Sequence, residues 1–164
     1  MKQFLAILFL TLFSVGTLSA QNTLSPRATA QHGNVTVEYG QPSKRGRVVF
    51  GGLEPYGQVW RTGANEATTI TFKKDGTFGG KAVKAGTYTL YTIPREKEWE
   101  FILNSKLGQW GAYEYEKIKG SDVLHVTVPS KQTKEVVEVF TITVKADAML
   151  LEWDQTQVSV PLKF

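Results

Sequence analysis

The chain has 164 residues, a formal net charge of +4 and no cysteine. The length suits a single domain, because domains commonly run to about 100–150 residues. The lack of cysteine excludes disulfides, thiol catalysis, cysteine metal sites and lipid attachment to a cysteine. Positive and negative side chains are interleaved along the chain, which argues against nucleic acid as a partner.

An export signal is the first element that the sequence predicts. Lys2 precedes the apolar run FLAILFLTLFSV at 4–15, and the small-residue run GTLSA ends at Ala20. This order is typical of a cleaved signal peptide. The apolar run is too short for a membrane helix, which needs roughly 20 apolar residues. We therefore expect a signal peptide at 1–20, no membrane insertion after its removal, and an exported protein, either periplasmic or extracellular.

After a polar lead-in at 21–33, the sequence predicts one β domain at 34–164. Nine short segments are rich in β-branched and aromatic residues, as strands are. These segments are Asn34–Tyr39, Arg47–Phe50, Thr68–Lys74, Thr87–Ile93, Glu98–Leu103, Asp122–Val128, Val136–Val144, Ala148–Trp153 and Val158–Phe164.

Turn residues separate these segments, among them Asp75-Gly76, Gly79-Gly80, Ala85-Gly86 and the polar run at 154–157. Short strands with such turns are typical of antiparallel sheets packed face to face. The run Ala112–Lys119 has room for one or two helical turns at most, because glycines flank it. The predicted fold is an all-β, single antiparallel β-sandwich of about nine strands.

Four stretches carry a resemblance to a known family. They read GRVVFGGLEPYGQVWRTGANEATTITF at 46–72, KAGTYTLYTIP at 84–94, EWEFILN at 98–104 and QWG at 109–111. The chain resembles a family of exported proteins, mostly from Bacteroidetes, catalogued as domain of unknown function number twenty-nine eleven. The resemblance covers Leu24–Phe164, although an Arg often stands in that family where this chain has His125. It implies an exported β protein and no particular activity.

The stretch WRTGANEAT at 60–68 is the candidate site, because an Arg, an Asn and a Glu fall between small residues beside a Trp. In one interpretation Arg61 pairs with Glu66, Asn65 caps a turn and Trp60 fills the core. In the other, these side chains line a pocket and present donors and acceptors to a glycan or a peptide.

The pocket interpretation predicts six ligand-binding residues, namely Tyr56, Trp60, Arg61, Asn65, Glu66 and Trp110. Tyr56 and Trp60 would form the floor, and Trp110 would be a partly exposed aromatic platform. The basic run Lys44–Arg47 reads most simply as a solvated hairpin turn, with contact to an anion as the alternative.

Catalytic and metal-binding patterns are sparse. His32 and His125 show no ligand spacing, so we expect no metal and no cofactor. We expect a non-enzymatic binding or interaction module. The alternatives are a glycan hydrolase that uses Glu66 with Glu54 or Glu114 as its second carboxylate, and a purely structural domain without a ligand.

The predicted signal peptide has a direct test. We expect the exported protein to lack residues 1–20, and its intact mass measures this. Retention of these residues, or recovery of the protein only in detergent, would contradict the prediction.

Overall fold

The computed structural model describes residues 24–164, so the predicted signal peptide and its cleavage site lie outside the described residues. In the described part, no helix is long and apolar enough to cross a membrane.

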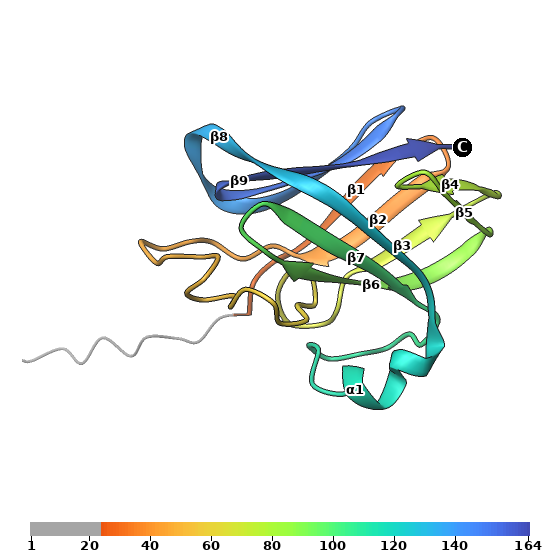
Figure 1. The fold of residues 1–164 in the computed structure, drawn as a ribbon, viewed down its shortest axis with the longest axis horizontal. Helices are drawn as coiled ribbons and strands as arrows, with labels where there is room; N and C mark the ends of the chain where they lie inside the picture. The colour runs from red at the N-terminus through yellow and green to blue at the C-terminus, as the bar shows by residue number, and fades with distance from the viewer. Residues whose placement is uncertain (1–23) are drawn as a thin grey trace, which may run out of the picture.

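Nine strands form one antiparallel sheet in the order β1-β2-β3-β6-β7-β8-β9-β4-β5 (Figure 1). This confirms the all-β antiparallel fold class. The strands are β1 (Arg27–His32), β2 (Val35–Gly40), β3 (Thr69–Phe72), β4 (Gly76–Phe78), β5 (Lys81–Val83), β6 (Gly86–Pro94), β7 (Glu98–Asn104), β8 (Asp122–Val144) and β9 (Ala148–Lys163).

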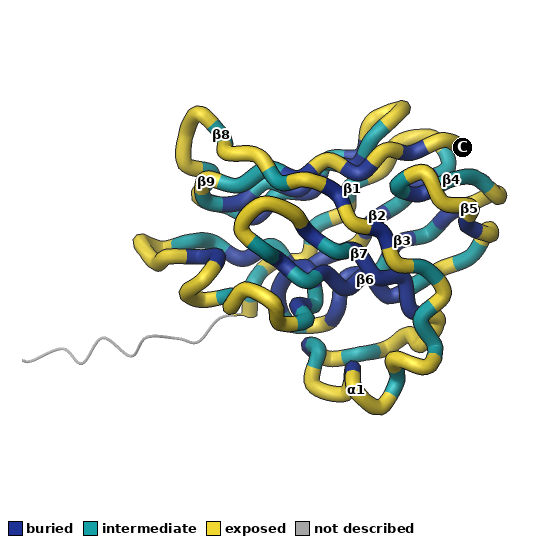
Figure 2. Tube along the Cα trace, in the orientation of Figure 1, coloured by how far each residue is buried: buried dark blue, intermediate teal, exposed yellow. Residues whose placement is uncertain are grey.

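The sheet folds back on itself because β8 passes from one layer to the other. Residues 122–129 of β8 pair with β7, whereas its later residues pair with β9. Aromatic rings then meet across the layers, for example Tyr39 of β2 with Phe140 of β8, and Phe78 of β4 with Phe101 of β7. The buried residues lie mainly on the strands, and the exposed ones mainly in the connections (Figure 2).

The burial pattern along β9 shows how sequence phase and backbone agree. Met149, Leu151 and Trp153 are buried at odd positions, and Val158 and Val160 at even ones. The change of phase falls at the polar run 154–157, where Asp154 has a positive φ of 53° and the pairing with β8 shifts register. An irregularity of this kind moves the apolar set back to the core face. The run 154–157 is therefore an irregular part of the single strand β9 and not the predicted turn between two strands, and the extra residues of the register shifts lie on β8.

Several predicted boundaries are wrong. Residues 27–32, expected in the polar lead-in, form strand β1, which pairs with β2 at one edge of the sheet. Arg47–Phe50 is not a strand but part of the long connection between β2 and β3. The four segments expected after residue 121 are two long strands, β8 and β9. The short hairpin β4–β5 is additional, with the predicted Gly79-Gly80 turn between its strands.

The predicted short helix is present as α1 (Tyr115–Ile118), followed by a 3-10 turn at Lys119–Ser121. It covers the outer face of β6 and β7, where Tyr115 packs on Tyr91 with ring centres 5.2 Å apart. The Tyr115 hydroxyl donates to Asp122 Oδ2 at 2.6 Å. This carboxylate and the burial of the ring raise the pKa of Tyr115. These contacts fix the connection from β7 to β8 on the sheet.

Trp60 occupies the centre of the core between the layers. Its side chain is 2% exposed and contacts the rings of Phe50, Trp99, Phe140 and Trp153. Trp60 pairs with Thr92 of β6, which aligns the candidate stretch with the sheet. The prediction that Trp60 forms part of a pocket floor is not met, because its ring belongs to the core.

We expect Trp60→Ala to lower the free energy of unfolding by about 3–5 kcal/mol, because the lost indole leaves a cavity among four rings. Urea denaturation followed by circular dichroism measures the change. Trp110→Ala is the matched control, since Trp110 is 54% exposed, and we expect it to change stability by less than about 0.5 kcal/mol. An unchanged midpoint for Trp60→Ala would contradict the core position of this residue.

Candidate functional site

The stretch Trp60–Thr68 is a loop closed by its own hydrogen bonds. The Thr68 amide donates to the Arg61 carbonyl at 3.1 Å, and the Thr68 hydroxyl donates to the Thr62 carbonyl at 2.7 Å. Thr62 and Asn65 have left-handed backbones, with φ of 57° and 62°. For a β-branched residue such as Thr62 this conformation is unfavourable, at about 1–3 kcal/mol, and it persists only where surrounding contacts enforce it.

Close approach to the end of β2 supplies that enforcement. The Ala64 amide donates to the Gly40 carbonyl at 3.2 Å. A Cβ atom on Gly40 would overlap the Ala64 carbonyl oxygen, so a glycine is required there. The loop is therefore a rigid ridge at the edge of the sandwich.

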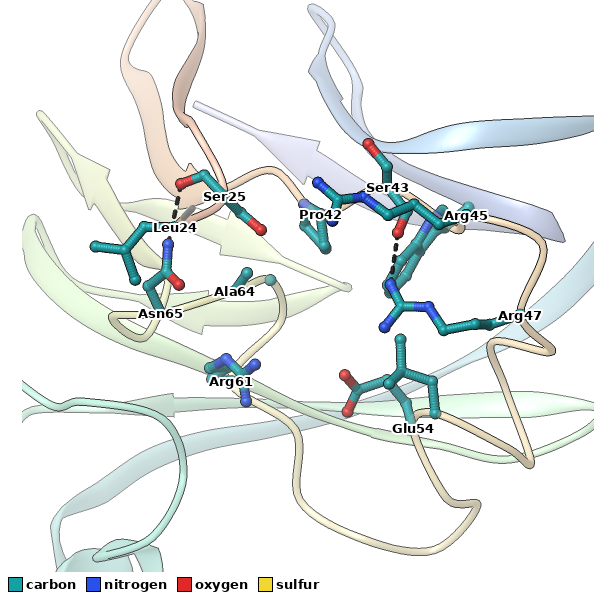
Figure 3. A pocket seen from close by; sticks show the side chains of 13 residues that line it. Leu24, Ser25, Pro42, Ser43, Arg45, Arg47, Glu54, Arg61, Ala64 and Asn65 are labelled. Atoms are coloured by element: carbon teal, nitrogen blue, oxygen red, sulfur yellow. Dashed lines mark hydrogen bonds between the residues drawn. The ribbon is translucent and has the colours of Figure 1, made fainter. Parts of the chain in front are cut away.

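One side of the ridge faces an open cavity of about 320 Å³, which we call the arginine cavity (Figure 3). Its charged and amide lining comes from one long connection, between β2 and β3, with three residues before the ridge and two on it. These lining side chains are Arg45, Arg47, Glu54, Arg61 and Asn65.

The two exposed arginines reach the cavity because the connection after β2 is bonded to β8. The Lys44 amide donates to the Glu138 carbonyl at 2.7 Å, and the Arg45 amide donates to the Glu138 carboxylate at 2.8 Å. The Arg47 guanidinium donates to the Ser43 carbonyl at 2.7 Å, as Figure 3 shows. The predicted exposed turn at Lys44–Arg47 is present, since the Arg47 amide donates to the Lys44 carbonyl at 3.1 Å, but it lies within the connection between β2 and β3 and not between two strands. It places two guanidinium groups at the cavity.

Charges in the arginine cavity are not neutralised by partners in the described part of the chain. Arg45, Arg47, Arg61 and Glu54 form no ion pair among residues 24–164. Within the same residues, the buried Nε of Arg61 has no hydrogen-bond partner. Buried polar groups in native proteins are nearly always bonded, so an unpaired one needs an explanation.

Glu54 has an unusual protonation equilibrium. Burial raises the pKa of Glu54 to about 7, against the opposing effect of the Arg61 and Arg47 charges, which lower it. Desolvation therefore outweighs two nearby positive charges, because neither of them bonds the carboxylate directly. The cavity therefore holds three guanidinium groups beside a carboxyl group whose pKa is raised to about 7.

Glu66 points to the opposite side of the ridge from Asn65. Its carboxylate pairs with Arg27 at 3.0 Å and lies at a second cavity of about 330 Å³, which we call the tryptophan cavity. The polar and aromatic lining of this cavity is Arg27, Glu66, Thr69, Gln109 and Trp110. The predicted pairing of Arg61 with Glu66 is therefore wrong.

The six predicted site residues are thus divided among four places. Arg61 and Asn65 line the arginine cavity, Glu66 and Trp110 line the tryptophan cavity, and Trp60 is in the core. Tyr56 lines a third cavity, with Val48, Glu96 and Gln132 among its walls. The sequence did not indicate Arg45, Arg47 and Glu54 as ligand-binding residues. An anion contact was nevertheless the alternative interpretation of the basic run at 44–47.

Comparison with known proteins gives a family. A family model described as Protein of unknown function (DUF2911) matches residues 19–162. The chain belongs to this family. No curated protein and no solved structure matches the chain significantly. The family description names no activity. The two cavities are therefore the features of the structure that bear on function.

Residues 24–164 bring no cluster of three metal ligands together and no pair of carboxylates to either cavity. Within residues 24–164, no three His, Asp or Glu side chains converge as metal ligands do. Among the described residues, Glu54 is the carboxylate that lines the arginine cavity, and Glu66 is the one that lines the tryptophan cavity.

The raised pKa of Glu54 predicts a pH-dependent stability. The folded state keeps the proton up to about pH 7, whereas the ordinary pKa of a Glu carboxyl is 4.5. Its stabilising contribution is therefore complete below pH 4.5 and is lost as pH rises through 7. Glu54→Gln keeps the shape without the titration. We expect the melting temperature of Glu54→Gln, relative to that of the parent, to rise between pH 5 and pH 8.

Thermal unfolding of both proteins at the two pH values measures this difference. All other titrating groups are common to the two proteins, so their contributions cancel in the comparison. An identical offset at pH 5 and pH 8 would contradict the raised pKa.

Proposed function

We propose that the chain is a non-enzymatic binding module of the cell envelope, and that the arginine cavity binds a small ligand through a carboxylate on a glycan or a peptide. The observation that carries the proposal is the convergence of Arg45, Arg47 and Arg61 on one open cavity without an ion pair in the described part of the chain. An anion would supply the missing partner.

The shape and chemistry of the cavity favour a carboxylate. A guanidinium group presents a planar fork of donors that matches the two oxygens of a carboxylate. The protonated Glu54 can donate one further hydrogen bond, since its pKa is raised to about 7. The volume of about 320 Å³ lies at the small end of the roughly 300–1,000 Å³ seen for ligand pockets.

Binding is favoured over hydrolysis by the placement of the acids. A glycoside hydrolase needs two carboxyl groups about 5–9.5 Å apart on either side of the bond that it cleaves. Glu54 and Glu66 line different cavities on opposite sides of the ridge. Glu66 is bonded to Arg27, and its side chain is 59% exposed.

A place in the cell envelope is supported by the amino terminus. Lys2, the apolar run at 4–15 and the small residues up to Ala20 have the order of a signal peptide. A module exported in this way meets glycans and peptides outside the cytoplasm.

We expect D-glucuronate and a tripeptide with a free carboxyl terminus to bind, and D-glucose and the tripeptide amide to bind much more weakly. Arg61→Met should weaken binding of the acids about 10- to 100-fold, because a hydrogen bond to a charged group contributes about 1.5–3 kcal/mol. Isothermal titration calorimetry measures these affinities.

Arg95→Met is the matched control, because Arg95 pairs with Glu100 in another part of the protein. We expect it to bind like the parent. Equal affinities for acids and neutral analogues, or an unchanged affinity of Arg61→Met, would refute the proposed site.

A further inference from the structure

We infer that the tryptophan cavity is a sugar-stacking subsite, and that the ligand of the protein is an acidic oligosaccharide that places a carboxylate in the arginine cavity and a neighbouring ring on Trp110. This inference rests on the proposed function and narrows its ligand from a glycan or peptide to a glycan.

The two cavities lie on either side of a partition formed by residues 25–27 and 65–66. Ser25 lines the arginine cavity and Arg27 the tryptophan cavity, while Asn65 and Glu66 divide in the same way across the ridge. The Asn65 side chain donates to the Ser25 carbonyl at 3.0 Å, and this hydrogen bond forms the partition. Ser25 and Arg27 are two residues apart, and two residues of extended chain span roughly 7 Å. We therefore expect one short oligosaccharide to reach over the partition into both cavities.

Trp110 is held as a fixed platform rather than as a mobile loop residue. Its backbone forms a bridge with Glu66. On either side of it, the Ala67 amide donates to the Gln109 carbonyl at 2.9 Å, and the Gly111 amide donates to the Asn65 carbonyl at 3.0 Å. The side chain is nevertheless 54% exposed. A rigid aromatic ring that remains open to solvent binds a ligand with little loss of conformational entropy.

The polar lining of the tryptophan cavity suits hydroxyl groups. A hydroxyl both donates and accepts, and here it meets an acceptor on Glu66 and a donor on Arg27. These two side chains are 59% and 44% exposed, so both remain available to a ligand. Thr69 adds a hydroxyl and Gln109 an amide at the same cavity. The C–H face of a sugar ring stacks on an indole while its hydroxyls reach these groups.

The charge of the lining distinguishes a glycan from a peptide. The Glu66 carboxylate repels a second anion and places no demand for an apolar side chain. A ligand with its acid in the arginine cavity and a neutral, hydroxyl-rich unit beside Trp110 complements both cavities at once.

The test compares a monomer with an oligomer by isothermal titration calorimetry. The probes are D-glucuronate, a trisaccharide that contains glucuronate, the matching neutral trisaccharide and an acidic tripeptide. We expect the acidic trisaccharide to bind the parent at least about 10-fold more tightly than D-glucuronate. Trp110→Ala should abolish this gain, and Trp110→Phe should keep part of it.

Tyr113→Ala is the matched control, because Tyr113 is 78% exposed in the same connection but does not line the tryptophan cavity. It should keep the full gain. A trisaccharide no tighter than D-glucuronate, a gain that survives Trp110→Ala, or an equal gain with the tripeptide would overturn the inference and leave the proposed function standing. Failure of every acid to bind would overturn both.

Discussion

Trp60 lies between the two layers of the sandwich with its ring stacked on Trp153 at 5.9 Å, and the position of the whole site follows from that contact. Its amide and carbonyl bond to Thr92 of β6, at 2.7 and 2.9 Å. Because the indole and the backbone of Trp60 are both fixed, the next residue, Arg61, has a fixed position at the edge of the sandwich. The buried Trp60 therefore sets the position of Arg61, which lines the arginine cavity.

After Trp60, the chain adopts locally unfavourable backbone conformations that set the direction of its side chains. Thr62 and Asn65 take left-handed conformations, and Gly40 permits the approach that holds the ridge in place. The consequence is that Asn65 and Glu66, although adjacent, face different cavities. Local strain of this kind is typical of functional sites, where direction matters more than propensity.

The ion pair at the tryptophan cavity and the charged residues of the arginine cavity differ in how far they are exposed to solvent. The pair between Arg27 and Glu66 is largely in water, where such a pair contributes little to stability. In the arginine cavity, burial dominates, and it raises the pKa of Glu54 to about 7 despite the nearby Arg61. The guanidinium groups of Arg45, Arg47 and Arg61 at the same cavity form no ion pair among residues 24–164.

The sequence by itself indicated strands at β2, β3, β6, β7, β8 and β9, because alternating apolar residues bury one face whatever their partners are, as in Met149, Leu151 and Trp153. It also determined that Trp60–Thr68 is distinctive. Strand β1 was not predicted, because the apolar positions of RATAQH are the small Ala28 and Ala30, which pack against the core at one edge of the sheet. Only the tertiary structure decided that Arg61 lies with Arg47 and Glu54, and Glu66 with Arg27. The physical reason is that a side chain's direction in a loop depends on left-handed residues and on close contacts with distant strands, which no local pattern records.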